Sequence, residues 1–494
     1  MPRSIRFTGV CLGSSLRRPA CFAAVLLLVA IAAMRPAAAA GLVLSSSFAG
    51  AVDGGGGVPP DLQGAAGPDH LIVMLNTTFV AQRKSDGAVL RSWTPAAFWA
   101  PVSGGDLLFD PRVAYDALSA RWIAVIATEG IAGAPAVLLA VSDGTDPTRG
   151  WTFRTLPVGG GNYAEFPLLG YNARWIVVTS NLVSASGYLS GSAIWAIDKA
   201  ALLAGSPAAT RLTLNSPGSP IAPAVTLDPD EADELLVQEV SGNDLGRGRI
   251  RLLRLSDGGG TASLAPSKIV TAPATWSDAP SPLESLPQAG STRKIVSDQD
   301  EIASACVRNG RLWAVQTVTI PATASAPLHT EIQWWRIGSD GALGAFGRIG
   351  DAAGAAWLGF PSIAVNADDE ALIGYSLFSG DAFASAGYSV RAGCGGDAAL
   401  SEIRVLKNGE APYERLDGGG RNRWGDLSQT VVDPDGVRLW TLQEYAAAAD
   451  GGESRWGTWW GGFDPAGGRA GACVAPDAAP TPGSIAIGGR RGPE

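Results

Sequence analysis

The sequence contains little charge and almost no histidine. Charged residues make up 17% of the 494 residues, and His70 and His329 are the two histidines of the chain. This is too little material for a Ser-His-Asp triad, a Cys-His nucleophile or a Cys/His metal site. The sequence also has no P-loop, dinucleotide-binding fingerprint or EF-hand loop. We therefore expect no metal and no cofactor, and we interpret the acidic run 228–234 as a solvated turn rather than a calcium loop.

Apart from its N-terminus, the chain lacks a long apolar run. The first forty residues combine a basic start, an apolar run over 20–34 and small residues at 37–40, which is the pattern of a secretory signal peptide. This run is too short to span a membrane. We expect a mature protein that is secreted, to the extracellular space or the periplasm, as a monomer without a membrane span. The formal net charge is −9 and the signal carries only basic charges, so an acidic mature surface disfavours nucleic acid as a partner.

Cysteine is also scarce. Cys11 and Cys21 belong to the expected signal peptide, which leaves Cys306, Cys394 and Cys473. Three cysteines allow one disulfide at most, in an oxidising compartment. Cys306 lies in an apolar run, whereas the other two lie in glycine-rich loops, so pairing of Cys394 with Cys473 is favoured while the connectivity stays open.

Glycine and proline, in contrast, are abundant, with 64 and 33 residues, and both interrupt helices. Short apolar strands bounded by turn residues run along the whole chain, which predicts an all-β fold. One frame recurs: Pro, Ser or Gly, four mostly apolar or small residues, then Asp or Asn, followed by a Trp or Leu that opens another apolar run. This pattern predicts a strand, a turn closed by the Asx side chain, and a second strand with a large apolar anchor. The frame occurs at 64–69, 111–116, 167–172, 223–228, 304–309, 361–366 and 428–433.

The spacing of these frames predicts the architecture. Successive Asx residues are 47 to 81 positions apart, enough for four strands of about six residues plus loops. Such periods are typical of propellers. We predict a seven-bladed β-propeller, with six or eight blades as alternatives. The expected organisation is a signal peptide (1–40), a Gly-rich linker (41–57), the propeller (58–465) and a disordered tail rich in Gly, Pro and Ala (466–494).

Residues just before each frame should rim the central channel on one face. The candidate catalytic residues there are Asp110, Glu165 and Asp426, and Glu301 lies at an equivalent place. Arginine forks match carboxylates and aromatic faces cover sugar rings, so arginines and aromatics at the rim suggest a ligand site. The alternative is structural, with the polar groups bonding neighbouring blades and the tryptophans packing between blades. The candidate ligand-binding residues are Arg112, Phe166, Trp357, Phe360, Arg421, Arg423 and Trp424.

Several segments carry a family resemblance. Residues 109–116 (FDPRVAYD), 423–426 (RWGD) and 455–459 (RWGTW) resemble secreted bacterial proteins related to the sialidase-like (BNR) propellers. The resemblance covers most of 58–463. Sialidases carry Asp-boxes at outer turns, and the nearest match here, over 142–152, is stretched and single. The resemblance implies the propeller fold with a site at the channel.

Together these features lead to two functional hypotheses. The first is a non-catalytic propeller that binds an extracellular glycan or protein at its channel face. The alternative is a sialidase-like glycoside hydrolase, or a lyase, whose acid and base are Glu165 with Asp426 or Asp110, because glycosidic hydrolysis uses two carboxyls about 5 to 10 Å apart. If the protein is an enzyme at all, we expect a glycosidase.

Overall fold

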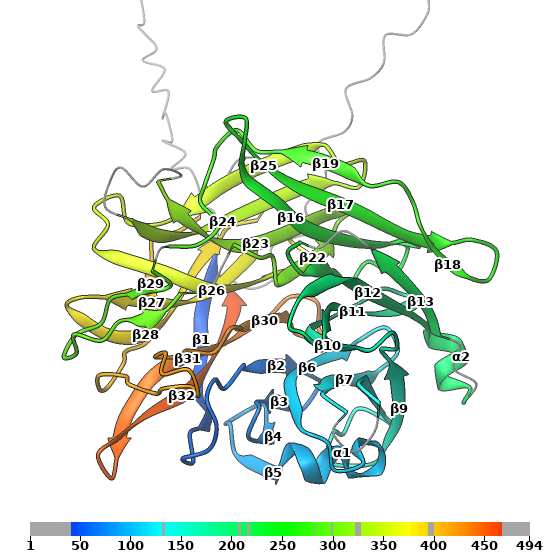
Figure 1. The fold of residues 1–494 in the computed structure, drawn as a ribbon, viewed down its shortest axis with the longest axis horizontal. Helices are drawn as coiled ribbons and strands as arrows, with labels where there is room; N and C mark the ends of the chain where they lie inside the picture. Colours follow the sequence, from blue (N-terminus) through cyan, green and yellow to red (C-terminus); the bar gives the residue numbers. More distant parts are fainter. Residues whose placement is uncertain are drawn as a thin grey trace, which may run out of the picture. The chain divides into compact units, whose positions relative to one another are not determined.

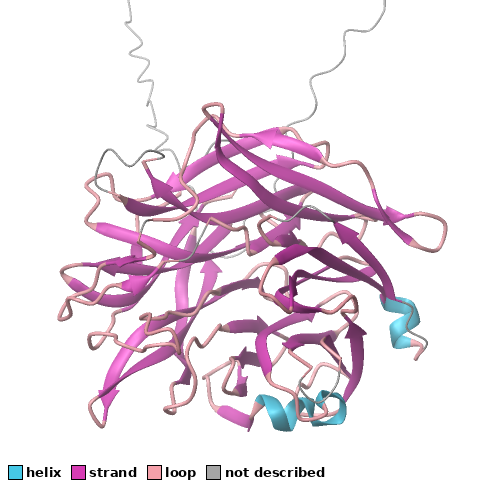
Figure 2. Cartoon of the chain, in the orientation of Figure 1, coloured by secondary structure: helices cyan, strands magenta, loops and turns pink. Residues whose placement is uncertain are grey.

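The computed structural model describes residues 41–130, 134–205, 209–214, 218–280, 282–297, 300–321, 328–393 and 400–466. Strands are the main secondary structure of these residues, with two short helices, α1 (Pro95–Ser103) and α2 (Lys199–Leu203) (Figure 2). The all-β class is confirmed. The expected signal peptide, Cys394, Cys473 and almost all of the expected tail lie outside the described residues. Cys306 is a buried free thiol.

Most sheets are antiparallel meanders in chain order. The first contains β2 (Gln63–Ala66), β3 (His70–Met74), β4 (Phe79–Arg83) and β5 (Val89–Trp93). The second contains β6 (Leu108–Asp116), β7 (Arg121–Thr128), β8 (Ala136–Ser142) and β9 (Trp151–Pro157). Another contains β26 (Ala356–Val365), β27 (Ala371–Ser379), β28 (Ala382–Arg391) and β29 (Arg404–Lys407). A five-stranded sheet contains β14 (Ile221–Pro223), β16 (Glu234–Asp244), β17 (Arg247–Asp257), β18 (Ala262–Leu264) and β19 (Lys268–Thr271).

A further sheet joins the two ends of the described chain. It contains β30 (Gln429–Val432), β31 (Leu439–Asp450), β32 (Glu453–Pro465) and, at its outer edge, β1 (Leu42–Val52). Figure 1 shows β1, in blue, beside β32, in red. The prediction of a Gly-rich linker at 41–57 is therefore wrong, because most of this segment is the strand β1, which pairs with β32 near the end of the described chain. Pairing of the first strand with the last closes the fold without a covalent link.

Two groups of four strands merge into one nine-stranded sheet. The first group contains β10 (Asn162–Tyr171), β11 (Trp175–Ser184), β12 (Leu189–Asp198) and β13 (Ala209–Leu214), and the second contains β22 (Ser304–Arg308), β23 (Arg311–Ile320), β24 (His329–Gly338) and β25 (Leu343–Ile349). The two-residue strand β15 (Val225–Thr226) pairs in parallel with both groups. Among the described residues, five separate sheets of four or five strands therefore stand where seven blades were predicted. A small two-stranded sheet contains β20 (Glu284–Leu286) and β21 (Ile295–Val296).

The innermost strands surround a channel. In chain order β2, β6, β10, β14, β22, β26 and β30 each contact the next, and β30 contacts β2. These strands line a cavity of about 60 Å³, which holds only a few water molecules. Sheets arranged radially around a channel make a β-propeller. The predicted propeller architecture is therefore confirmed, apart from the number of blades.

The recurrent frame corresponds to a real turn. Asn172 accepts hydrogen bonds from the backbone N–H groups of Arg174 and Trp175, at 2.9 and 2.7 Å. Asn366 accepts from Asp368 and Glu370 in the same way, at 3.0 Å each. The Asx side chain therefore closes the turn between the first and second strands, as predicted.

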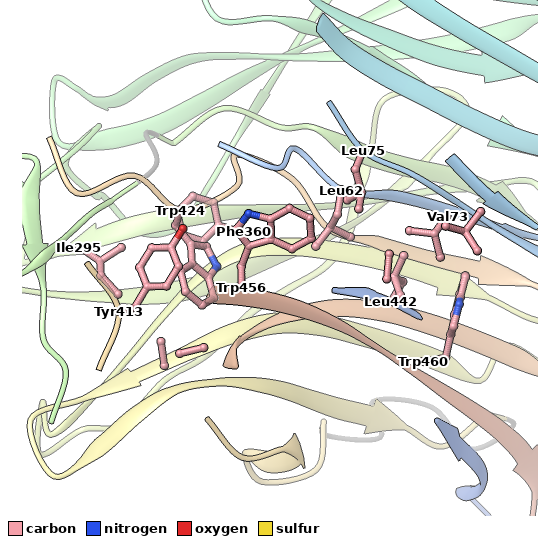
Figure 3. Packing of buried hydrophobic residues seen from close by; sticks show 14 of the residues in the cluster. Leu62, Val73, Leu75, Ile295, Phe360, Tyr413, Trp424, Leu442, Trp456 and Trp460 are labelled. Carbon is pink, nitrogen blue, oxygen red and sulfur yellow. The ribbon is translucent and has the colours of Figure 1, made fainter. Parts of the chain in front are cut away.

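Large aromatic side chains fill the space between neighbouring sheets. In the largest core cluster, Trp424, Trp456 and Trp460 are at most 1% exposed. Figure 3 shows Tyr413 beside Trp424, and their ring centroids are 4.8 Å apart with the planes at 77°. Among the described residues, no helix is long and apolar enough to cross a membrane.

Candidate functional site at the channel mouth

The inner strands begin with a repeated backbone irregularity. Asp110, Phe166 and Phe360 each precede the proline of a frame, and each has φ of 55°, in the left-handed region. The strand register shifts at all three places. These are β-bulges, which bend a strand and redirect its side chains. The bulges turn the side chains at the start of the inner strands toward one end of the channel, which we call the mouth.

Hydrogen bonds link the bulges of neighbouring sheets. The N–H of Asp110 donates to Asn76 Oδ1 at 2.8 Å, and the N–H of Phe166 donates to Asp110 Oδ2 at 3.2 Å. At the closure of the ring, the N–H of Asp426 donates to Asp61 Oδ1 at 2.8 Å, and Asn76 Nδ2 donates to Asp61 Oδ2 at 2.7 Å. The carboxylates of Asp61 and Asp110 are therefore fixed in place by backbone and amide donors.

Six charged side chains, on or shortly before the inner strands of four sheets, lie within electrostatic reach of one another at the mouth. Burial raises the pKa of Asp61 to about 7, and Asp110 adds to this shift. Burial also raises the pKa of Glu165 to about 7, with Asp426 as the strongest neighbouring charge. We call this group the mouth cluster: Asp61, Asp110, Arg112, Glu165, Arg423 and Asp426.

The acids of the mouth cluster outnumber its bases. Burial raises the pKa of Asp110 and of Asp426 to about 6 each, although Arg112 lowers both and Arg423 lowers that of Asp426. Arg423 binds Asp426 Oδ1 at 2.6 Å. Two guanidiniums thus do not neutralise four carboxyls, and near neutral pH the cluster holds protons that free carboxyls would have lost.

Arg112 is one of the most buried members of the cluster. It is 2% exposed, and its guanidinium lies over the ring of Phe166, 5.2 Å from the centroid. Burial lowers its pKa to about 10. Nη1 donates to the carbonyl of Pro111 at 3.3 Å, whereas Nε and Nη2 have no hydrogen-bond partner. Arg112 therefore acts mainly as a buried positive charge beneath the carboxyls.

Exposure at the mouth is uneven. The side chain of Asp426 is 38% exposed, and the side chain of Arg423 is 16% exposed. Glu165 is half-buried, and none of the described residues donates a hydrogen bond to its carboxylate. A ligand in solution would therefore meet Glu165 and Asp426 first.

The structure brings some predicted site residues together and places others elsewhere. Asp110, Arg112, Glu165, Phe166, Arg423 and Asp426 meet at the mouth. Trp424 and Phe360 are 1% and 3% exposed in the core, where Trp424 donates to Ser376 Oγ at 3.0 Å. Trp357 packs, half-buried, against the same core. Arg421 is exposed and pairs with Asp417 at 2.7 Å, in a turn of its own.

Sequence reasoning missed several acids near the mouth. Asp61 lies three positions before the first frame rather than next to it, and it is not followed by a proline as Asp110 is. Glu444 lies on β31, where its Oε2 accepts from the N–H of Gly425 at 3.0 Å, and burial raises its pKa well above the ordinary range. Two further buried acids were missed, Glu239 on β16 and Asp300 shortly before β22. A signal that could have indicated Asp61 is its position, since it precedes an inner strand as Asp110 does.

The described residues do not supply an evident metal site. No group of three or more His, Cys, Asp or Glu side chains among them is arranged to hold a metal ion. The two histidines lie apart on different strands, His70 on β3 and His329 on β24. The carboxyls of the mouth are instead spread between backbone donors and arginines.

Comparison with known proteins gives only distant matches. No family model matches the sequence, and no curated protein matches it. Among solved structures, cobalt-substituted Synechocystis apocarotenoid oxygenase is 11% identical with a TM-score of 0.44, covering 71% of this chain and 72% of that one. A chimera of apocarotenoid oxygenase and RPE65 is 10% identical with a TM-score of 0.42 and the same coverage. A Dyadobacter fermentans protein of unknown function is 10% identical with a TM-score of 0.37, covering 86% of this chain and 99% of that one.

These matches correct the expected relationship. The structural neighbours are apocarotenoid oxygenases rather than sialidases, so the predicted resemblance to BNR propellers is wrong. The glycan- or protein-binding role and the sialidase-like hydrolase or lyase are wrong as well, as is the expectation that any activity would be that of a glycosidase. At such low identities and TM-scores, the chemistry of the neighbours themselves is not transferred to this chain.

Proposed function

We propose that the channel mouth binds a small organic cation that carries an ammonium group. The observation that supports this most is the gathering of Asp61, Asp110, Glu165 and Asp426 against only two arginines. An ammonium has three donors and no acceptor, so one ammonium can pair with more than one of the carboxylates around the mouth. A bound cation would also offset the burial and the mutual repulsion that raise the pKa values of these carboxyls.

The fixed positions of the carboxylates support this proposal. Asp61 and Asp110 already accept hydrogen bonds from Asn76, Asp426 and Phe166, so ligand binding would not need to order them. Ordering costs are a large part of what weakens binding, and a fixed site avoids them. Glu165 lacks such donors and would gain most from a cation.

Binding should release protons. A ligand cation favours the ionised form of every carboxyl beside it, so it lowers their pKa values from about 6 to 7 toward the ordinary range. The affinity should therefore rise with pH between about 5 and 8, while an alkylamine itself stays charged.

Calorimetric titration of the purified protein with butylamine tests this. We expect saturable binding whose affinity increases about tenfold from pH 5.5 to pH 8. Glu165→Gln should weaken binding at pH 8 about tenfold. Glu402→Gln is the matched control, because Glu402 is exposed next to outer strand β29 and should leave the affinity unchanged. Absence of binding by the wild type at both pH values would refute the proposal.

We further propose that the propeller has seven blades and that the chain is exported. The nine-stranded sheet counts as two blades in this proposal, since β15 contributes only two residues between two complete four-stranded groups. The pattern over residues 1–40 supports export as a monomeric propeller of 41–465 followed by a tail. An N-terminus near residue 41 on the protein recovered from its native host would support this, and an intact Met1 would contradict it.

A further inference from the structure

A groove lies between the second sheet and the helix α2. It has a volume of about 290 Å³ and is partly open to solvent. The strands β7, β8 and β9 line it, and so do Leu202 and Leu203 of α2. β6 runs from the mouth, at Asp110, to Asp116, and Arg121, which lines the groove, follows the turn at that far end. The groove therefore lies away from the mouth cluster.

The strand register places two arginines on the sheet side of the groove. Ile123 on β7 pairs with Val141 on β8, and Leu139 on β8 pairs with Arg154 on β9. Side chains two positions apart in a strand share a face, so Arg121 and Arg154 lie on the same face as Val141. Two strand spacings of about 4.8 Å and four residue steps of about 3.3 Å put the Cα atoms of these arginines on the order of 16 Å apart.

Neither arginine of the groove has an acidic partner among the described residues. Nη1 of each donates to the backbone carbonyl of the preceding residue, at 3.0 Å for Arg121 and 2.8 Å for Arg154. Asp116, opposite Arg121 in the sheet, binds the Lys199 ammonium at 2.6 Å instead. The exposed Asp143 also lines the groove, so the lining carries one net positive charge in a chain whose formal net charge is −9. Both guanidiniums are half-buried and within reach of a ligand in solution.

Apolar side chains line the groove between and opposite the arginines. Val141 lies on β8, between the strands that carry Arg121 and Arg154. Leu203 on α2 is 48% exposed, and Leu202 beside it is 6% exposed. A methylene chain in the groove would remove apolar surface of these side chains from water, which is favourable. The groove therefore combines two separated positive charges with an apolar surface.

We infer that this groove binds an aliphatic dicarboxylate, with one carboxylate on Arg121, the other on Arg154 and the methylene chain against Val141 and the leucines of α2. A guanidinium binds the two oxygens of a carboxylate with parallel hydrogen bonds. A single phosphate would instead have to draw together two arginines that start on different strands. This site is additional to the proposed cation site at the mouth and does not depend on it.

Comparison of acids of equal chain length tests the inference. Succinate and butyrate, adipate and hexanoate, and suberate and octanoate are titrated calorimetrically into the purified protein at pH 7.5, with inorganic phosphate as a compact anion. We expect one dicarboxylate to bind at least about tenfold more tightly than its monocarboxylate, which makes the second carboxylate worth about 1.4 kcal/mol. Phosphate should bind more weakly than that dicarboxylate.

Variants assign the two carboxylates to the two arginines. Arg121→Gln and Arg154→Gln should each bring the ratio of dicarboxylate to monocarboxylate affinity close to one. Leu203→Glu changes an exposed side chain, leaves both arginines in place, and should weaken the dicarboxylate about tenfold by repulsion. Arg404→Gln removes the same charge from the exposed face of β29 and should change nothing.

Three results would overturn the inference. These are equal binding of dicarboxylates and monocarboxylates, or of phosphate and the best dicarboxylate; an affinity ratio that survives in both arginine variants; and no binding of any of these anions. Each result leaves the butylamine titration of the mouth unaffected, so the failure of one site is distinguishable from the failure of the other.

Discussion

Replacing Glu165 by glutamine tests whether the mouth cluster carries unrelieved negative charge. Glu165 is half-buried, and its pKa of about 7 lies above the ordinary 4.5 mainly because of burial, with Asp426 and Asp61 contributing. Glutamine keeps the size and removes the charge. Because none of the described residues donates to the carboxylate, the substitution breaks no internal hydrogen bond.

The sign of the effect follows from the raised pKa. Between about pH 4.5 and pH 7 the unfolded chain has lost the Glu165 proton while the native protein retains it, so the wild type loses stability as pH rises through this window. A pKa of about 7 instead of 4.5 corresponds to at most about 3 kcal/mol at pH 8. Since water screens a half-buried carboxylate, we expect about 1–2 kcal/mol.

Urea denaturation without ligand is the assay. Glu165→Gln should be more stable than the wild type by about 1–2 kcal/mol at pH 8 and equal to it within error at pH 4.5. Glu402→Gln removes a charge at an exposed site and should have little effect at either pH. A Glu165→Gln variant that is less stable than the wild type at pH 8 would refute the reasoning, because its charge would then be stabilising.

Three further predictions concern how the fold is held together. Asn76→Ala removes the donor to Asp61 and the acceptor of the Asp110 N–H, and should cost about 2–3 kcal/mol in urea denaturation. The fully buried Asp116 lies 2.6 Å from the Lys199 ammonium, and Lys199→Met leaves it without this partner. The substitution should lower the free energy of unfolding by about 3–5 kcal/mol. A loss below about 1 kcal/mol would show that the pair contributes little. Deletion of residues 42–52 exposes the edge of β32 and should lower the thermal midpoint and cause concentration-dependent association in sedimentation velocity.

Much of the fold could be predicted because its signals are local. An Asx side chain that closes a turn bonds residues two to four positions away, so Asn172 and Asn366 are visible in the sequence. The strand β1 was not predictable in the same way. The hydroxyl of its Ser45 donates to the carbonyl of Gly462, 417 positions away. A Ser- and Gly-containing segment has no strong strand pattern of its own.

The site was predictable where it follows the frame and not elsewhere. Asp110, Glu165 and Asp426 precede frames, and bulges occur at Asp110 and next to Glu165. Asp61 meets Asp426 across 365 positions, which only closure of the ring brings about. Trp424 was predicted to bind a ligand at the rim, but it is buried in the core. Rim and core positions lie only a few residues apart here, so one bend of the backbone decides which side chain is buried.

The most direct test of the central claim is the number of protons released when an amine binds. Butylamine is titrated at pH 6.5 in two buffers of different ionisation enthalpy, and the difference in heat gives the proton count. We predict release of about one proton per ligand, decreasing in Glu165→Gln, because a cation at the mouth ionises carboxyls whose pKa values lie near 6 to 7. Binding with the same heat in both buffers, or no binding, would contradict a carboxyl-rich cation site at the channel mouth.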